Sequence, residues 1–112
     1  MRDLVKMQCV RVRRGDPPAT AEEVKAGLTQ LPGWSVVEQG GIERIEKSFQ
    51  FKDFREALAF TNEIGALAEE QDHHPLIVTE WGRVTVQWWT HVVEGLHLND
   101  FIMAAKTDQI KV

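Results

Sequence analysis

The sequence lacks the features that mark secreted and membrane-inserted proteins. Its single cysteine, Cys9, excludes a disulfide within the chain and is typical of a reducing compartment. No apolar run approaches the roughly 18 residues that span a membrane, and the N-terminus lacks the apolar stretch of a signal peptide. We therefore expect a cytoplasmic protein with no membrane partner.

An excess of positive charge is also absent. The chain has 13 Lys and Arg against 17 Asp and Glu, a formal net charge of −4. Non-specific binding to nucleic acid depends on neutralising phosphates, so we expect no nucleic-acid partner. One local basic cluster, formed by Arg11, Arg13 and Arg14, is interpreted as part of a solvated arm.

What is present is the composition of one folded domain. The 112 residues are 43% hydrophobic and 27% charged, which is typical of globular proteins large enough to bury a core. Residues 1–19 end in "GDPPA", where a glycine and two prolines oppose helix formation. We expect residues 1–19 to form an extended N-terminal arm and residues 20–112 to form a single domain.

Local signals in the first half of the chain predict a helix, a hairpin and a second helix. Thr20 has Glu23 three residues later, the spacing of a capping box, and the helix that it begins should end at the "LPG" of residues 31–33. Gly40-Gly41 separates two strand-like runs, which is typical of a tight hairpin. Asp53 then begins the longest apolar periodicity, a helix that must stop before Pro75.

The second half predicts another hairpin and a last helix. "LIVTEW" and "RVTVQWWTH" flank Gly82, and Asn99 is the expected cap of a helix over residues 100–110. The resulting order is α-β-β-α-β-β-α. We therefore predict an α+β fold, with a four-stranded antiparallel sheet covered by three helices on one face.

Three of the four histidines, His73, His74 and His91, fall within nineteen positions. Histidine donates and accepts protons near neutral pH, so the cluster suggests acid–base chemistry. The first two lie where the second helix ends, and His91 lies at the end of the last predicted strand. From these residues alone, we expect an acid–base site or a ligand pocket beside the second hairpin.

Other interpretations of the same residues stay open at this point. Three imidazoles with Asp100 could coordinate zinc, although adjacent histidines project in different directions and no HExxH pattern is present. Asp100 could instead serve only the start of its helix, and Glu69 could lie on a solvated helix face. Trp34 and Trp81, like the other two tryptophans, suit either core packing or the wall of a flat ligand site.

The spacing of these residues resembles the signature of the pterin-4a-carbinolamine dehydratase family, also called the dimerization-cofactor family. That signature has an acidic residue, three positions, His-His-Pro, five positions, an aromatic, nine positions, His, eight positions and Asp. It is matched here by Glu69, His73-His74-Pro75, Trp81, His91 and Asp100. "PGW" at residues 32–34 and "FKDF" at residues 51–54 are also similar to family segments.

The resemblance implies dehydration of 4a-hydroxytetrahydropterin to quinonoid dihydropterin, with the pterin as substrate and neither a metal nor another cofactor. This step recycles the cofactor of aromatic amino acid hydroxylases, as in phenylalanine hydroxylation. His73 and His91 are the implied acid–base groups, while His74 orients the pterin and shares in proton transfer. Asp100 is expected to support His91, and Glu69 the histidine pair. The expected substrate-binding residues are Pro75, Trp81 and Trp34.

The resemblance also implies self-association, as a homodimer or homotetramer, with an aromatic amino acid hydroxylase as a candidate partner. Two alternatives differ in function. The first is a non-catalytic dimerisation or regulatory partner, because animal members of the family assist a homeodomain transcription factor. The second keeps the pterin pocket but takes a molybdopterin-related substrate.

Overall fold

The computed structural model describes residues 3–112. Its α+β order confirms the predicted fold class, and two short 3-10 helices are added to it. The elements are η1 (Leu4–Lys6), α1 (Ala21–Thr29), β1 (Ser35–Gln39), β2 (Ile42–Gln50), α2 (Phe54–Gln71), β3 (Leu76–Glu80), β4 (Arg83–Trp88), η2 (His91–Val93) and α3 (Leu98–Asp108). Met1 and Arg2, the first residues of the predicted arm, lie outside the described residues. No helix within residues 3–112 is long and apolar enough to cross a membrane.

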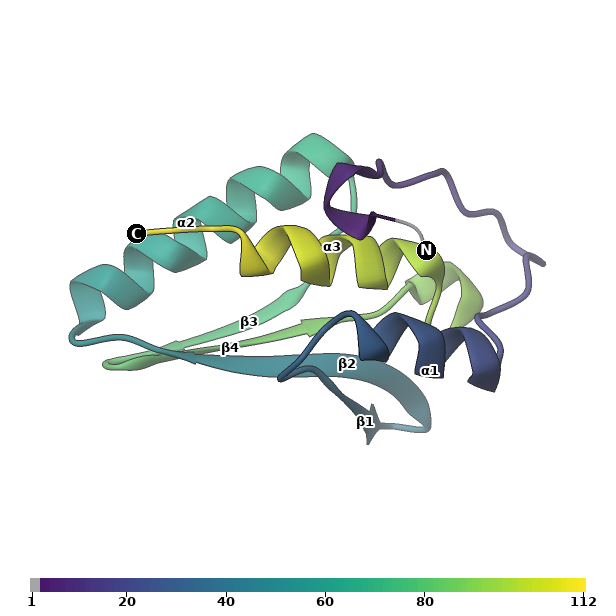
Figure 1. Cartoon of the computed structure of the whole chain (residues 1–112), viewed down its shortest axis with the longest axis horizontal. Coiled ribbons are helices and arrows are strands. Elements are labelled where there is room, and N and C mark those ends of the chain that lie inside the picture. The colour runs from purple at the N-terminus through teal and green to yellow at the C-terminus, as the bar shows by residue number, and fades with distance from the viewer. Residues whose placement is uncertain (1–2) are drawn as a thin grey trace.

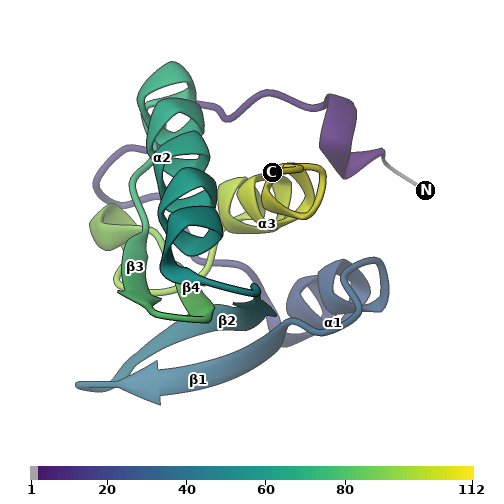
Figure 2. The ribbon, with the colours of Figure 1, turned by 90° about the vertical axis from the view of Figure 1, so that its left-hand side faces the viewer.

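The four strands form one antiparallel sheet in the order β1-β2-β4-β3. Gln39 pairs with Ile42 across Gly40-Gly41, and both glycines have positive φ, which confirms the predicted two-residue turn. The second hairpin also turns through two residues, because Glu80 pairs with Arg83. All three α-helices lie on one face of this sheet, with α3 between α1 and α2 (Figures 1 and 2).

The predicted helix starts in the first half of the chain are confirmed by their hydrogen bonds. Thr20 accepts from the backbone N–H of Glu23 while Glu23 accepts from that of Thr20, so the capping box is complete. Asp53 caps α2 by accepting from the N–H of Glu56. At its other end α2 stops at Asp72, whose left-handed conformation turns the chain toward Pro75.

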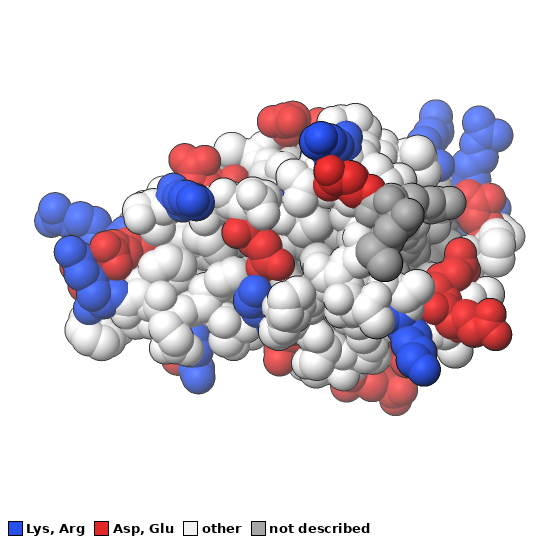
Figure 3. All heavy atoms as spheres, viewed as in Figure 1, with Lys and Arg blue, Asp and Glu red and all other residues white. Residues whose placement is uncertain are grey.

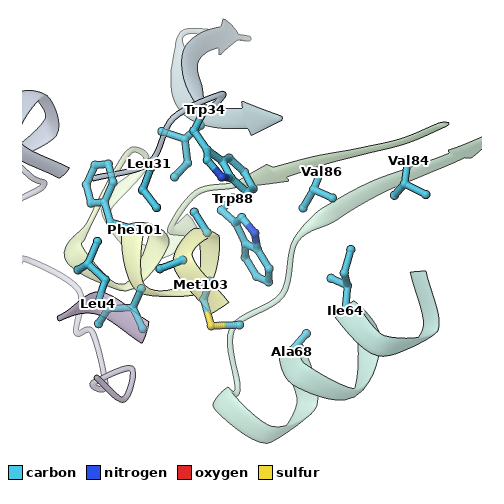
Figure 4. Packing of buried hydrophobic residues seen from close by; sticks show 14 of the residues in the cluster. Leu4, Leu31, Trp34, Ile64, Ala68, Val84, Val86, Trp88, Phe101 and Met103 are labelled. Carbon is cyan, nitrogen blue, oxygen red and sulfur yellow. The ribbon is translucent and has the colours of Figure 1, made fainter. Parts of the chain in front are cut away.

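The core lies between the sheet and the helices. Val84, Val86 and Trp88 alternate along β4 and are fully buried on its inner face, as their even spacing predicts. Ile64 of α2 and Met103 of α3 cover them from the helical layer (Figure 4). Burying each such side chain contributes about 1.5–3 kcal/mol, so this layer holds the site elements in place.

The N-terminal arm lies along the surface of the domain, with its three arginines exposed as expected, but it is anchored at several points. Leu4 belongs to the core, with 4% of its surface exposed. Asn99 of α3 then holds Val10 from both sides, accepting from its N–H at 3.0 Å and donating to its carbonyl at 2.7 Å. The arm thus passes over the helices before it reaches α1 (Figure 2).

Two predicted boundaries in the second half were wrong. β4 ends at Trp88, so His91 is the first residue of η2 and does not lie on the strand. Asn99 is not the cap of α3, because His97 takes that position and accepts from the N–H of Asn99 through Nδ1. The final helix therefore covers residues 98–108, two residues earlier than predicted.

Candidate active site

The three clustered histidines line one hollow of about 610 Å³. Four segments of the chain form its walls: the arm, the end of α2 with the turn that follows it, the segment from Thr90 through η2, and the start of α3. The lining residues are Cys9, Val10, Arg11, Val12, Gln71, Asp72, His73, His74, Thr90, His91, Val92 and Asn99. The structure thus brings together His73, His74 and His91 in a space large enough for a small heterocycle.

His73 is the most firmly held of the three. Its ring stacks on the buried Trp88 with centroids 5.7 Å apart and planes 10° from parallel. Its Nε2 lies 2.6 Å from Oδ1 of Asp100, and only 12% of its side chain is exposed. Because an ionised carboxylate only accepts, Nε2 carries the shared hydrogen and Nδ1 is the nitrogen free to exchange a proton with a ligand.

Asp100 is fully buried and holds the site together through three hydrogen bonds. Besides His73 on Oδ1, its Oδ2 accepts from the Thr90 hydroxyl and from the backbone N–H of His97, both at 2.9 Å. The histidine that Asp100 contacts is therefore His73, whereas the resemblance implied support of His91. The packing of α3 beside the end of α2 brings the carboxylate at the start of α3 to the histidine that follows α2.

His74 and Glu69 form a second pair near the rim. Nε2 of His74 lies 2.5 Å from Oε2 of Glu69, so the member of the histidine pair that Glu69 contacts is His74. The two side chains are 55% and 78% exposed. A pair this exposed contributes little to stability, typically about 0–1 kcal/mol, and His74 keeps freedom to adjust to a ligand.

His91 is positioned by aromatic packing. Its ring centroid lies 4.8 Å from that of Trp89, at 53°. The guanidinium of Arg44 lies over the Trp89 ring at 3.8 Å, and Arg44 donates to the side chain of Gln87. Arg44, on the outer face of the sheet, thus supports the Trp89 ring against which His91 packs.

The three expected substrate-binding residues do not line this hollow. Trp34 is buried in the core at 5% exposure, and its Nε1 donates to Asp108. Trp81 lies in the turn between β3 and β4 and is 70% exposed. Pro75 follows the histidine pair and leads the chain into β3 without forming part of the wall.

The zinc alternative finds no matching geometry in the described part of the chain. Between residues 3 and 112, no group of three His, Cys, Asp or Glu side chains is arranged to hold a metal ion. His73 and His74 each bond a different carboxylate, as expected for adjacent residues that project apart.

Cys9 lines the same hollow but is poorly suited to act as a nucleophile. Burial, reinforced by the negative charge of Asp100, raises the pKa of its thiol to about 11, and Lys106 opposes the shift only in part. Since the thiolate is the reactive form, the thiol is largely inert near neutral pH.

Sequence reasoning missed several residues that shape the site. Trp88 supports His73, while Thr90 and the backbone of His97 position Asp100. His97 and Asp100 do have capping-box spacing, but histidine is not among the usual N-cap residues. The sequence therefore predicted Asn99, a common N-cap residue, as the start of this helix. No local pattern indicated that residues 9–12 of the arm would form a wall.

Comparison with known proteins places this arrangement in a family. Residues 17–110 match the profile described as "Pterin 4 alpha carbinolamine dehydratase". Proteins of Syntrophotalea carbinolica and Chlorobium luteolum, both provisionally named pterin-4-alpha-carbinolamine dehydratases, are 52% and 48% identical over 110 residues. These alignments cover 98% of this chain and 98% and 96% of the two relatives.

A solved structure agrees with the sequence matches. The crystal structure of a transcriptional coactivator/pterin dehydratase from Brucella melitensis aligns with a TM-score of 0.74 at 37% identity, covering 81% of this chain and 95% of that one. The fold, the profile and the relatives therefore agree, and the chain belongs to the pterin 4 alpha carbinolamine dehydratase family, a family of hydro-lyases.

Proposed function

We propose that this chain dehydrates 4a-hydroxytetrahydropterin to quinonoid dihydropterin by histidine acid–base catalysis. The observation that carries the proposal is His73, which is held between Trp88 and the buried Asp100 in the same hollow as His74 and His91. A fixed imidazole backed by a carboxylate is suited to accept a proton, because the carboxylate stabilises the imidazolium that forms.

The reaction requires two proton transfers. One proton leaves the ring nitrogen next to C4a, and its electron pair forms the new C=N bond as the C4a–O bond breaks. A second proton reaches the departing hydroxyl, which leaves as water. The pterin is itself the substrate, so we propose that no further cofactor takes part.

We propose distinct roles for the three histidines. His73 takes the ring-nitrogen proton through Nδ1, and Asp100 stabilises the resulting charge. His91, packed on Trp89, delivers the proton to the hydroxyl from the neighbouring wall. His74, more exposed and paired with Glu69, orients the pterin and helps return protons between turnovers.

The direct test follows loss of the ultraviolet absorbance of chemically generated 4a-hydroxytetrahydropterin. Wild type should accelerate this loss, and His73→Ala should lower kcat about 100-fold or more, the usual worth of a positioned acid or base. Glu70→Ala, at an exposed position beside Glu69 near the same helix end, is the matched control and should retain wild-type rates. Equal rates for wild type and His73→Ala would sink the proposal.

We further propose a cytoplasmic role in recycling the cofactor of an aromatic amino acid hydroxylase, as in phenylalanine hydroxylation. The quinonoid product is the form that a reductase can return to the tetrahydro state, and the one free cysteine suits a reducing compartment. In a coupled assay, adding this protein should prevent the 4a-hydroxypterin from accumulating during phenylalanine hydroxylation. Accumulation unchanged by the protein would count against this role.

Self-association as a homodimer or homotetramer is also proposed, through the β3 edge of the sheet and the adjoining side of α2. Leu76 and Val78 on the outer face of β3 are 39% and 45% exposed, and Phe54 and Leu58 of α2 are 46% and 44% exposed. Apolar side chains beside a free strand edge are typical of an interface. Light scattering at micromolar concentration should give at least a dimer, whereas a monomer for wild type would contradict this part.

A further inference from the structure

A second hollow of about 430 Å³ lies beside the histidine hollow. The two hollows share the lining residues Arg11, Val12, His91 and Val92, so they adjoin one another along the arm and η2. The second hollow adds Arg13, Arg14 and Glu94. Its lining residues therefore include three arginines and one glutamate, in a chain whose net charge is −4.

None of these three arginines is neutralised by an ion pair within residues 3–112. The ion pairs there involve other cations, and no carboxylate oxygen lies within 4.0 Å of the guanidinium nitrogens of Arg11, Arg13 or Arg14. All three arginines are exposed. In Figure 3, basic side chains project at the end of the molecule over which the arm runs, with acidic ones nearby.

The arm presents these charges at a fixed place beside the site. Asn99 holds Val10, one residue before Arg11, by two hydrogen bonds. Farther along, Asp16 accepts from the N–H of Arg13 at 2.8 Å and donates its own N–H to the Arg13 carbonyl at 3.0 Å, which closes a turn around Arg14. The arginines are thus restrained at both ends of their segment, and less entropy is lost when they bind a ligand.

We propose that this second hollow binds a phosphate ester on the side chain of a reduced pterin whose ring occupies the histidine hollow. This inference rests on the proposed function and narrows its substrate class. Arginine presents a planar fork of donors that matches phosphate oxygens, and such charge-assisted bonds are stronger than neutral ones. A neutral hydroxylated side chain would leave three unpaired guanidinium groups without a role.

The test compares 6-hydroxymethyltetrahydropterin with its phosphate monoester by titration calorimetry under anaerobic conditions. Wild type should bind the phosphate ester about tenfold more tightly or better, a gain that corresponds to one or two charge-assisted hydrogen bonds. Inorganic phosphate should compete with the ester, and added salt should reduce the preference. The double variant Arg13→Gln/Arg14→Gln should lose most of the preference, whereas Arg55→Gln, at an exposed position on α2, should keep it.

The same comparison in the dehydration assay separates this inference from the proposed function. Wild type should show a higher kcat/KM for the phosphorylated 4a-hydroxypterin than for the unphosphorylated one, and the double variant should lower that ratio. Equal binding and equal kcat/KM would overturn the phosphate site and leave the dehydratase standing. Tighter binding of the ester without dehydration of either pterin would overturn the dehydratase and support the site. Binding of neither pterin would overturn both.

Discussion

Asp100 connects the protein's stability to the chemistry proposed for it. A fully buried carboxylate is costly unless its oxygens are hydrogen-bonded, and here three donors, from His73, Thr90 and His97, satisfy them. The same bonds hold the His73 ring in one orientation. Removing the charge should therefore affect turnover more than substrate affinity.

Asp100→Asn should lower kcat about 100-fold with little change in KM, because the imidazolium formed on His73 loses its stabilising charge. Steady-state dehydration rates measure this effect. Thr90→Val is the comparison variant, because it removes one bond to Asp100 and leaves the His73–Asp100 pair intact. A kcat for Asp100→Asn close to that of wild type would show that the pair is structural only.

Cys9 should resist alkylation in the folded protein. With a thiol pKa raised from 9.0 to about 11, the thiolate fraction near pH 8 is about 100-fold lower than in the unfolded chain. The sign follows from burial and the Asp100 charge, both of which disfavour the anion. Iodoacetamide labelling followed by mass spectrometry should show a rate that keeps rising toward pH 11, and urea-unfolded protein is the control. A plateau near pH 9 in the folded state would refute the shift.

The start of α3 organises the site at the level of secondary structure. His97 caps the helix, Asn99 holds the arm at Val10, and Asp100 holds His73, so three residues at the start of α3 have three different roles. The arm is therefore tied to the helix by a side chain and not by a strand pairing. Gln71 and Lys106 hold earlier residues of the arm, but Asn99 supplies both side-chain hydrogen bonds to Val10, directly before the arginines.

Asn99→Ala should loosen the arm from Val10 onward and make the peptide bonds after Arg11, Arg13 and Arg14 more accessible to trypsin. Losing two hydrogen bonds to Val10 should also lower the free energy of unfolding by about 1–2 kcal/mol. Limited proteolysis and urea unfolding measure the two effects. Asn62→Ala, at an exposed position on α2, should change neither, and an arm that stays protected in Asn99→Ala would contradict this account.

In the molecule as a whole, the first hairpin and the helical layer meet at a partly buried carboxylate, that of Asp108. Lys47 alternates with apolar residues on the inner face of β2, and its Nζ lies 2.9 Å from Asp108. Trp34 donates to the same carboxylate. The charge that interrupts the apolar alternation of β2 is thus paired with the last residue of α3.

Trp34→Phe should therefore lower stability without weakening substrate binding. The lost indole contacts and the lost hydrogen bond to Asp108 should together cost about 1–3 kcal/mol, while KM stays at its wild-type value. Thermal unfolding and steady-state kinetics distinguish this from a role as a ligand wall. A raised KM with unchanged stability would restore Trp34 to the substrate site.

Local sequence signals were sufficient for most of the fold. The caps at Thr20 and Asp53, the Gly40-Gly41 turn and the helix end before Pro75 depend on residues a few positions apart, and all four are found. The cap of α3 was misjudged because an imidazole performed the task of a hydroxyl or carboxylate. The end of β4 was misjudged because Trp89, although buried, lies beyond the last paired residue of the strand.

The sequence by itself determined the order of the elements and, through the spacing of Glu69 to Asp100, the family. Only the tertiary structure decided that Asp100 meets His73, 27 residues away, while Trp34 enters the core and Trp81 stays exposed. It also decided that the arm arginines lie beside His91. The physical reason is the separation in sequence of the interacting residues. Caps and turns depend on residues a few positions apart, whereas the hydrogen-bond donors of a buried carboxylate depend on how the helices pack on the sheet.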